Sequence, residues 1–117
     1  MIIKRVRPAG RVRRSGDLFV GEHEYQNAVG TESAQFRMSE LTFRDGAHTK
    51  MHVHDSEQIV LVIAGEGIIA TAAEEQRIGT GDVEIAERHI GEVVRRRGIG
   101  EHHFGHQLRT AIGRDRR

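Results

Sequence analysis

The segment GAHTKMHVHDSEQIVLVIAG, residues 46–65, carries the strongest fold signal in the sequence. It contains two histidines, His52 and His54, whose side chains would point to one face of a strand because a single residue separates them. Neutral imidazoles in such a pair are good ligands for Zn, Fe, Ni, Cu or Mn. Two candidates for a third ligand follow, Glu57 and Gln58, and as neighbours in a strand only one of them can face the histidines. Bare chemistry favours Glu57, because a carboxylate binds a divalent metal more strongly than a neutral amide.

The sequence around this segment alternates between apolar and polar residues, with the period of two that is typical of strands. In residues 34–43 the apolar face changes phase, which predicts a β-bulge near Ser39 or Glu40. Residues 58–63 predict a strand, and residues 68–72 a strand that returns beside it after a glycine-containing turn. Short strands separated by glycine turns predict an all-β sandwich or small barrel.

Composition limits the classes of protein that are possible. A chain of 117 residues suits one compact domain, so we expect a single domain over residues 1–117. Without cysteine, disulfides and thiolate metal sites are excluded, which fits the cytoplasm. The basic ends, about residues 1–15 and 113–117, are interpreted as solvated or loosely ordered rather than as a nucleic-acid site, since no aromatic residues interleave with them. The longest apolar runs are too short to span a membrane.

Residues 46–65 resemble the first motif of the cupin superfamily. That motif reads glycine, five residues, His-x-His, three or four residues, glutamate or sometimes glutamine, six residues, glycine. From Gly46 to Gly65 every interval fits if Gln58 is the third ligand, whereas Glu57 would shift two intervals by one residue. The resemblance implies a jelly-roll β-barrel with a divalent metal ion (Zn, Ni, Mn or Fe) held inside by the two histidines and Gln58.

The second motif of the family fits less well. It usually runs from a Gly-Asp turn to a Pro-x-Gly turn, with a histidine ligand about eleven residues after the first glycine. Here Gly81-Asp82 begins the motif, but no proline follows and His89 comes eight residues after Gly81. Three alternatives are open: a shortened loop brings His89 to the metal as fourth ligand, Glu92 supplies an oxygen ligand, or this motif supplies none. In the last case three protein ligands remain, which is chemically sound because catalytic metals keep an open position.

Further candidates concern acid–base chemistry. Phe104 and His106 look like a pair on the last strand of many small cupins. If His106 faces inward with Leu108, it lines the pocket as a proton-transfer residue; otherwise it is a histidine of the core. Glu57 or His48 could also serve as acid or base, depending on which way each side chain points.

The predicted function is a metal-dependent enzyme acting on a small molecule, of the isomerase, lyase, hydrolase or dioxygenase type. A neutral glutamine leaves the metal more positive than a carboxylate would, which favours Lewis-acid chemistry over oxygen activation. The alternative is a non-catalytic metabolite- or metal-binding module, which the irregular second motif favours. The resemblance also implies a homodimer, and the strand at residues 59–63, apolar on both faces, fits a subunit contact.

Overall fold

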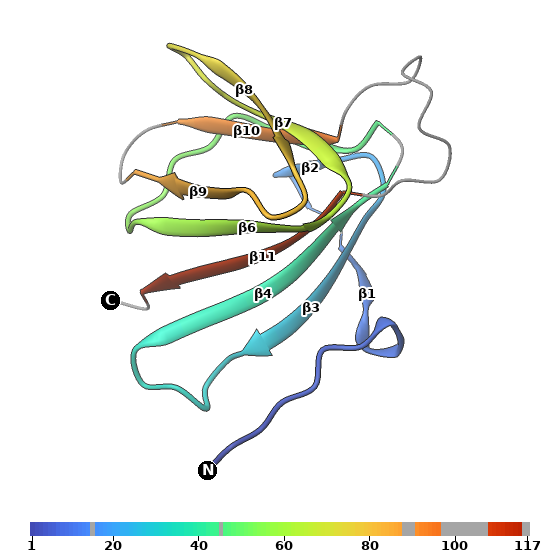
Figure 1. Cartoon of the computed structure of the whole chain (residues 1–117), viewed down its shortest axis with the longest axis vertical. Helices are drawn as coiled ribbons and strands as arrows, with labels where there is room; N and C mark the ends of the chain where they lie inside the picture. Colours follow the sequence, from blue (N-terminus) through green and yellow to red (C-terminus); the bar gives the residue numbers. More distant parts are fainter. Residues whose placement is uncertain (15, 45, 88–90, 97–107, 116–117) are drawn as a thin grey trace.

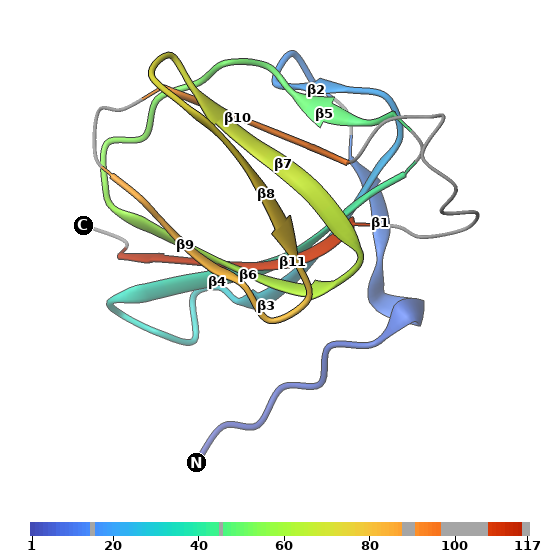
Figure 2. The same ribbon diagram turned by 45° about the horizontal axis from the view of Figure 1, so that its top comes forward.

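Two antiparallel sheets lie face to face in the computed structural model of the chain (Figure 1 and Figure 2). The structure describes residues 1–14, 16–44, 46–87, 91–96 and 108–115. Its elements are, in chain order, the 3-10 turn η1 (Pro8–Gly10) and the strands β1 (Val12–Arg14), β2 (Phe19–Val20), β3 (His23–Val29), β4 (Phe36–Phe43), β5 (His48–Thr49), β6 (Gln58–Ala64), β7 (Glu66–Thr71), β8 (Glu75–Gly79), β9 (Val83–Ala86), β10 (Glu92–Arg96) and β11 (Leu108–Asp115). The larger sheet has the order β1-β3-β4-β11-β6-β9 and the smaller one β2-β5-β10-β7-β8. The prediction of an all-β fold is confirmed.

The core lies between the two sheets and is built from the inward rows of their strands. Along β6, Val60 and Val62 are 1% and 2% exposed, whereas Ile59 and Leu61 are 50% and 39% exposed. This alternation follows from the pleat of the strand, which turns successive side chains to opposite faces. The buried cluster consists of Leu41, Phe43, Ala47, Val62, Ile69, Val94 and Leu108, drawn from both sheets. Among the described residues, no helix is long and apolar enough to cross a membrane.

The predicted hairpin over residues 58–72 is wrong. β6 pairs with β11 and β9 in the larger sheet, while β7 pairs with β10 and β8 in the smaller one. The chain passes from one sheet to the other at Gly65, whose φ of 90° suits a residue without a side chain. Each sheet thereby receives one apolar strand whose inward row covers the core. The local sequence predicts both strands but not their partners.

The bulge predicted near Ser39 or Glu40 is also wrong. β4 pairs with β11 in unbroken register over its whole length, and the register shift in this region lies in β3 instead. The apolar phase changes along β4 because Phe36 and Met38 lie on the outer face, where they are 56% and 40% exposed. The outer face of the larger sheet is therefore partly apolar.

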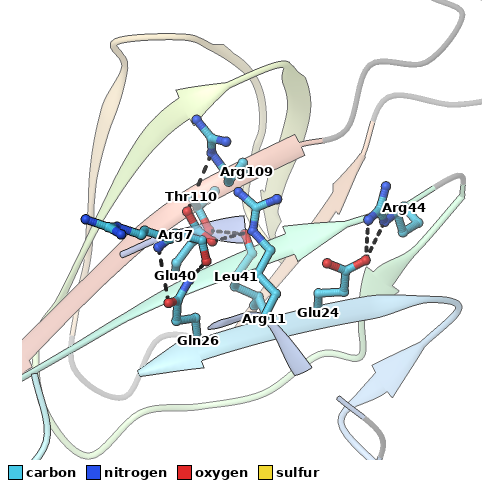
Figure 3. A network of polar contacts seen from close by, with 9 residues as sticks. All are labelled: Arg7, Arg11, Glu24, Gln26, Glu40, Leu41, Arg44, Arg109 and Thr110. Carbon is cyan, nitrogen blue, oxygen red and sulfur yellow. Dashed lines mark hydrogen bonds and ion pairs between the residues drawn. The ribbon is translucent and has the colours of Figure 1, made fainter. Parts of the chain in front are cut away.

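The N-terminal segment is attached to the outer face of the larger sheet (Figure 3). The Gln26 side chain accepts a hydrogen bond from the Arg7 backbone N–H at 3.2 Å and donates one to the Arg7 carbonyl at 2.8 Å. The buried carboxylate of Glu40 accepts a hydrogen bond from Arg11 Nε at 2.7 Å and lies 3.6 Å from Arg109 Nε. Further along, β1 pairs with β3. Residues 7–14, which the sequence suggests are loosely ordered, thus have specific partners.

His23, to which the sequence assigns no role, is a fully buried part of the core. Its ring lies between those of Phe19 and Phe43, with centroid distances of 4.6 and 4.8 Å. Nδ1 lies 3.2 Å from the carbonyl oxygen of Gly21, whereas Nε2 is buried without a hydrogen-bond partner among the described residues. Burial lowers the pKa of His23 below its usual value of 6.5, the proximity of His48 lowers it further, and the bond to Gly21 opposes both.

We expect His23 to make the fold less stable in mild acid. Because its pKa is lowered by folding, the unfolded chain takes up a proton first as the pH falls below 6.5, and stability decreases until the folded-state pKa is reached. The free energy of unfolding should lose at most about 1.4 kcal/mol per pH unit from this group. Urea unfolding of the wild type and of His23→Phe at several pH values between 5 and 8 measures the difference. An identical pH dependence in the two proteins would contradict the assignment.

Candidate functional site

A cavity of about 210 Å³ lies between the sheets. It is smaller than the roughly 300–1,000 Å³ of typical ligand pockets, so it has room only for a small ligand. Its wall contains both histidines of the quoted segment, Gln58, and the arginines Arg14, Arg37 and Arg114. The other described lining residues are apolar, aromatic or hydroxyl-bearing, and none of them is acidic. The cavity therefore combines nitrogen and oxygen donors with positive charge and an apolar wall.

His52 and His54 lie side by side at this cavity. Their ring centroids are 4.6 Å apart and the rings are nearly perpendicular, at 87°. Nδ1 of His52 lies 2.7 Å from the carbonyl oxygen of Lys50, so an Nδ1–H group donates a hydrogen bond to this carbonyl and Nε2 keeps its lone pair. A backbone carbonyl bound to the far nitrogen is the usual arrangement that orients metal-ligating histidines. His52 is therefore prepared to bind a metal through Nε2.

His54 is held in the form that a metal requires. Burial lowers its pKa below the usual 6.5, and the charges of His52 and Arg114 lower it further, while Asp55 acts in the opposite direction. Nε2 of His54 lies buried in the protein. A neutral imidazole is the ligating form, so the environment of His54 favours metal binding at neutral pH.

Gln58 and Glu57 face opposite sides, as expected for neighbours at the start of a strand. Gln58 is 6% exposed and lines the cavity with the two histidines. Glu57 is exposed and is not among the lining residues. Within the described part of the chain, no group of three or more His, Cys, Asp or Glu residues could hold a metal. Of the two neighbours, Gln58 is therefore the one placed to act as a third donor beside the histidines, and the chemistry of this donor set fits a divalent cation.

None of the other predicted site residues is among the described residues that line the cavity. His89 and His106, with Phe104, lie outside the described residues. Glu92 begins β10, where its backbone pairs with Thr71. His48 lies in β5 and is not among the residues that line the cavity. The structure thus brings together His52, His54 and Gln58.

Sequence reasoning missed the arginines of the cavity. It interpreted Arg14 and Arg114 as parts of solvated ends, and gave Arg37 no role. In the structure the Arg14 guanidinium lies 4.7 Å from the ring centroid of Tyr25 and 5.7 Å from that of Phe19. A signal was present, because Arg37 shares the inward phase of Leu41 and Phe43, and Arg114 that of Leu108, Thr110 and Ile112.

Comparisons with known proteins agree with this architecture. The family model of the AraC-like ligand binding domain matches residues 34–90. A predicted oxalate decarboxylase from Thermotoga maritima superposes with a TM-score of 0.81 at 17% identity, covering 97% of this chain and 98% of that one. The polyketide cyclase RemF from Streptomyces resistomycificus gives 0.78 at 16% identity, covering 97% and 80%. KdgF from Halomonas sp. gives 0.66 at 19% identity, covering 81% and 80%.

Cupin-like proteins recur among the similar structures, including a cupin-like protein from Thermotoga maritima and a cupin 2 conserved barrel domain protein from Rhodopseudomonas palustris. A search of curated proteins found no matching sequence. With the two-sheet architecture and the family-model match over residues 34–90, these structures show that the chain has the cupin fold that its sequence resembles. The predicted jelly-roll β-barrel is confirmed. At these low identities the structural likeness establishes the fold and not an activity.

Proposed function

We propose that the chain is a metal-binding cupin that uses a divalent cation to act on a small molecule inside the barrel. The observation that carries the proposal is the convergence of His52, His54 and Gln58 on one cavity. The hydrogen bond from His52 to the Lys50 carbonyl supports it, because it fixes the ring with Nε2 available. A small cavity with donors on one wall and apolar residues on the others is typical of sites that bind and orient a ligand.

The roles of the residues follow from their chemistry. His52, His54 and Gln58 would hold the cation, and a neutral third donor leaves more of its positive charge uncompensated. When bound, such a cation supplies Lewis-acid polarisation of a carbonyl or hydroxyl group. His89 would be a fourth ligand if a shortened loop brings it to the metal, and the resemblance of Phe104 and His106 to the pair on the last strand of small cupins supports His106 as the group that transfers a proton. Glu57 is the weaker acid–base candidate, because its side chain is exposed outside the cavity.

The test of this proposal is metal content. Wild-type protein, His52→Ala/His54→Ala and the control His48→Ala are purified without added metal, offered Mn, Fe, Ni and Zn, and measured by elemental mass spectrometry. We expect stoichiometric metal in the wild type and in the control, whose histidine lies outside the cavity lining, and loss of the metal in the double variant. A wild type that holds none of these metals would refute the proposal, as would a double variant that retains its metal.

A second candidate is a binding module without catalysis, which the match to the AraC-like ligand binding domain favours. The two candidates differ in the fate of the bound molecule. Metal-loaded protein is mixed with a set of small organic acids and followed by proton NMR. New signals that disappear in His52→Ala/His54→Ala support the enzyme, whereas line broadening of compounds that stay unchanged supports the binding module.

The homodimer predicted from the sequence is also part of the proposal. Ile59 and Leu61 of β6 lie opposite Ile85 and Val83 of β9, and all four side chains are 39–60% exposed on the outer face of the larger sheet. Cross-strand neighbours on one face pack together, so these residues form one apolar patch, which we call the β6–β9 patch. A second copy of the chain would cover it, because contiguous exposed apolar surface of this kind marks an interaction site.

The variant Ile59→Glu/Ile85→Glu tests the dimer. Two facing carboxylates in the centre of the β6–β9 patch should convert a dimer to a monomer at micromolar concentration, since like charges repel and lose hydration when covered. Sedimentation equilibrium measures the mass, and Val12→Glu, on strand β1 at the opposite edge of the sheet, is the control. If the wild type sediments only as a monomer, the dimer proposal fails.

A further inference from the structure

We propose that the cavity ligand is a small organic acid whose carboxylate is bound by Arg37 and Arg114 next to the metal-binding residues. The inference rests on the proposed function, because it assigns the substrate class of the same cavity.

Arg37 and Arg114 are brought together by strand register. Arg114 of β11 lies directly opposite Arg37 of β4 on one side and Gln58 of β6 on the other. All three residues line the cavity. This row of cross-strand neighbours therefore places two guanidinium groups beside Gln58, the proposed third metal donor. Side chains directly opposite in an antiparallel pair have Cβ atoms about 4.5–5.5 Å apart, and like charges at such positions are destabilising.

Within the part of the chain that the structure describes, no carboxylate pairs with these two arginines to offset the repulsion. Neither Arg37 nor Arg114 forms an ion pair with any residue that the structure describes, and the described cavity wall has no acidic member. The arginines on the outer side behave differently, since Arg11 and Arg109 share Glu40 and Arg44 pairs with Glu24 (Figure 3). An anion bound between Arg37 and Arg114 would supply the missing negative charge.

The shape and chemistry of the cavity indicate the kind of anion. The guanidinium group is a planar fork that binds carboxylate and phosphate through two parallel hydrogen bonds. Leu41, Val60 and Ile112 line the same cavity and suit an apolar body, while its volume of about 210 Å³ limits the ligand to a small molecule. Both arginines are exposed to solvent, so an anion entering from outside reaches them directly. A small acid with one apolar part meets all of these conditions.

Calorimetric titration of the full chain, metal-free and metal-loaded, tests the inference with benzoate, its neutral analogue benzamide, and phenyl phosphate. We expect benzoate to bind at least about tenfold more tightly than benzamide, since charge-assisted hydrogen bonds are roughly twice as strong as those between neutral groups. Arg37→Gln/Arg114→Gln should abolish this preference. Arg13→Gln, which alters an exposed arginine paired with Glu22 outside the cavity, should keep it.

The outcomes separate this inference from the proposed function. A benzoate preference that is lost in the arginine variant but kept in His52→Ala/His54→Ala supports the carboxylate site even if no metal is bound. Stoichiometric metal together with equal affinities for benzoate and benzamide, or with no benzoate binding at millimolar concentration, overturns the inference and leaves the metal site intact. Tighter binding of phenyl phosphate than of benzoate overturns the assignment to carboxylates. Circular dichroism of both arginine variants checks that they fold.

Discussion

Gln58→Ala is expected to weaken the binding of a divalent metal by more than the roughly 10–100-fold that loss of an outer-shell partner costs, whereas Glu57→Ala leaves the affinity unchanged. The two residues are neighbours, yet Gln58 is buried at the cavity and Glu57 is exposed outside it. Removing the amide deletes one of three donors, while removing the carboxylate deletes a group that does not face them. Competition titration against a chelator, with Zn and with Mn, measures both affinities.

The two variants control for each other, because each removes the polar side chain of one of two adjacent residues. Thermal unfolding of the metal-free proteins separates a loss of ligand from a loss of fold. The reverse result, with metal binding sensitive to Glu57 and insensitive to Gln58, would make the carboxylate the third ligand and would contradict the proposed donor set. Equal affinity in both variants and the wild type would place the metal elsewhere.

Phe43→Ala is expected to lower the free energy of unfolding by about 3–5 kcal/mol, as large deletions in a packed core do. Phe43 is 1% exposed, belongs to the buried cluster between the sheets, and stands edge-on to the ring of His23 at 4.8 Å. It also lines the cavity, so the space left by its ring would enlarge the ligand site. Because domains of this kind are stable by only about 5–15 kcal/mol, the loss would be a large part of the total.

Phe36→Ala is the matched control, because it deletes the same side chain from the same strand at a position that is 56% exposed. Its effect should be about 0.5 kcal/mol or less, as is usual at exposed positions. Urea unfolding at low protein concentration measures both variants. Similar losses at the two positions would mean that the outer face of β4 is covered, and would contradict the division of this strand into an inner and an outer row.

Much of the fold followed from local sequence. Alternation of apolar and polar residues predicted the strands at residues 58–63 and 68–72, and the resemblance of residues 46–65 to the first cupin motif implied the barrel. Within the quoted segment, the same alternation predicted that Gln58 and Glu57 face opposite sides, and the structure places Gln58 with both histidines at the cavity. These predictions succeed because the direction of a side chain relative to its own strand is a local property of extended backbone.

Predictions that depended on more distant parts of the chain were less successful. Residues 58–72 read as a hairpin, since two apolar strands flank a glycine turn, but β6 and β7 belong to different sheets. The change of phase of the apolar residues in β4 favoured a bulge, but it arises because the outer face of this strand also carries apolar side chains. In both cases the same local pattern fits two arrangements, and only long-range pairing decides between them.

The sequence by itself determined that this protein is built of short strands, and its resemblance to the first cupin motif implied that His52, His54 and Gln58 form one site. Only the tertiary structure decided which strands are neighbours, and therefore which charged side chains lie next to one another. Arg37 and Arg114 are far apart in the chain, and β4, β11 and β6 set them in one row with Gln58. The physical reason is that a strand fixes the facing of its own side chains, whereas the partners across the sheet are selected by closing a common core.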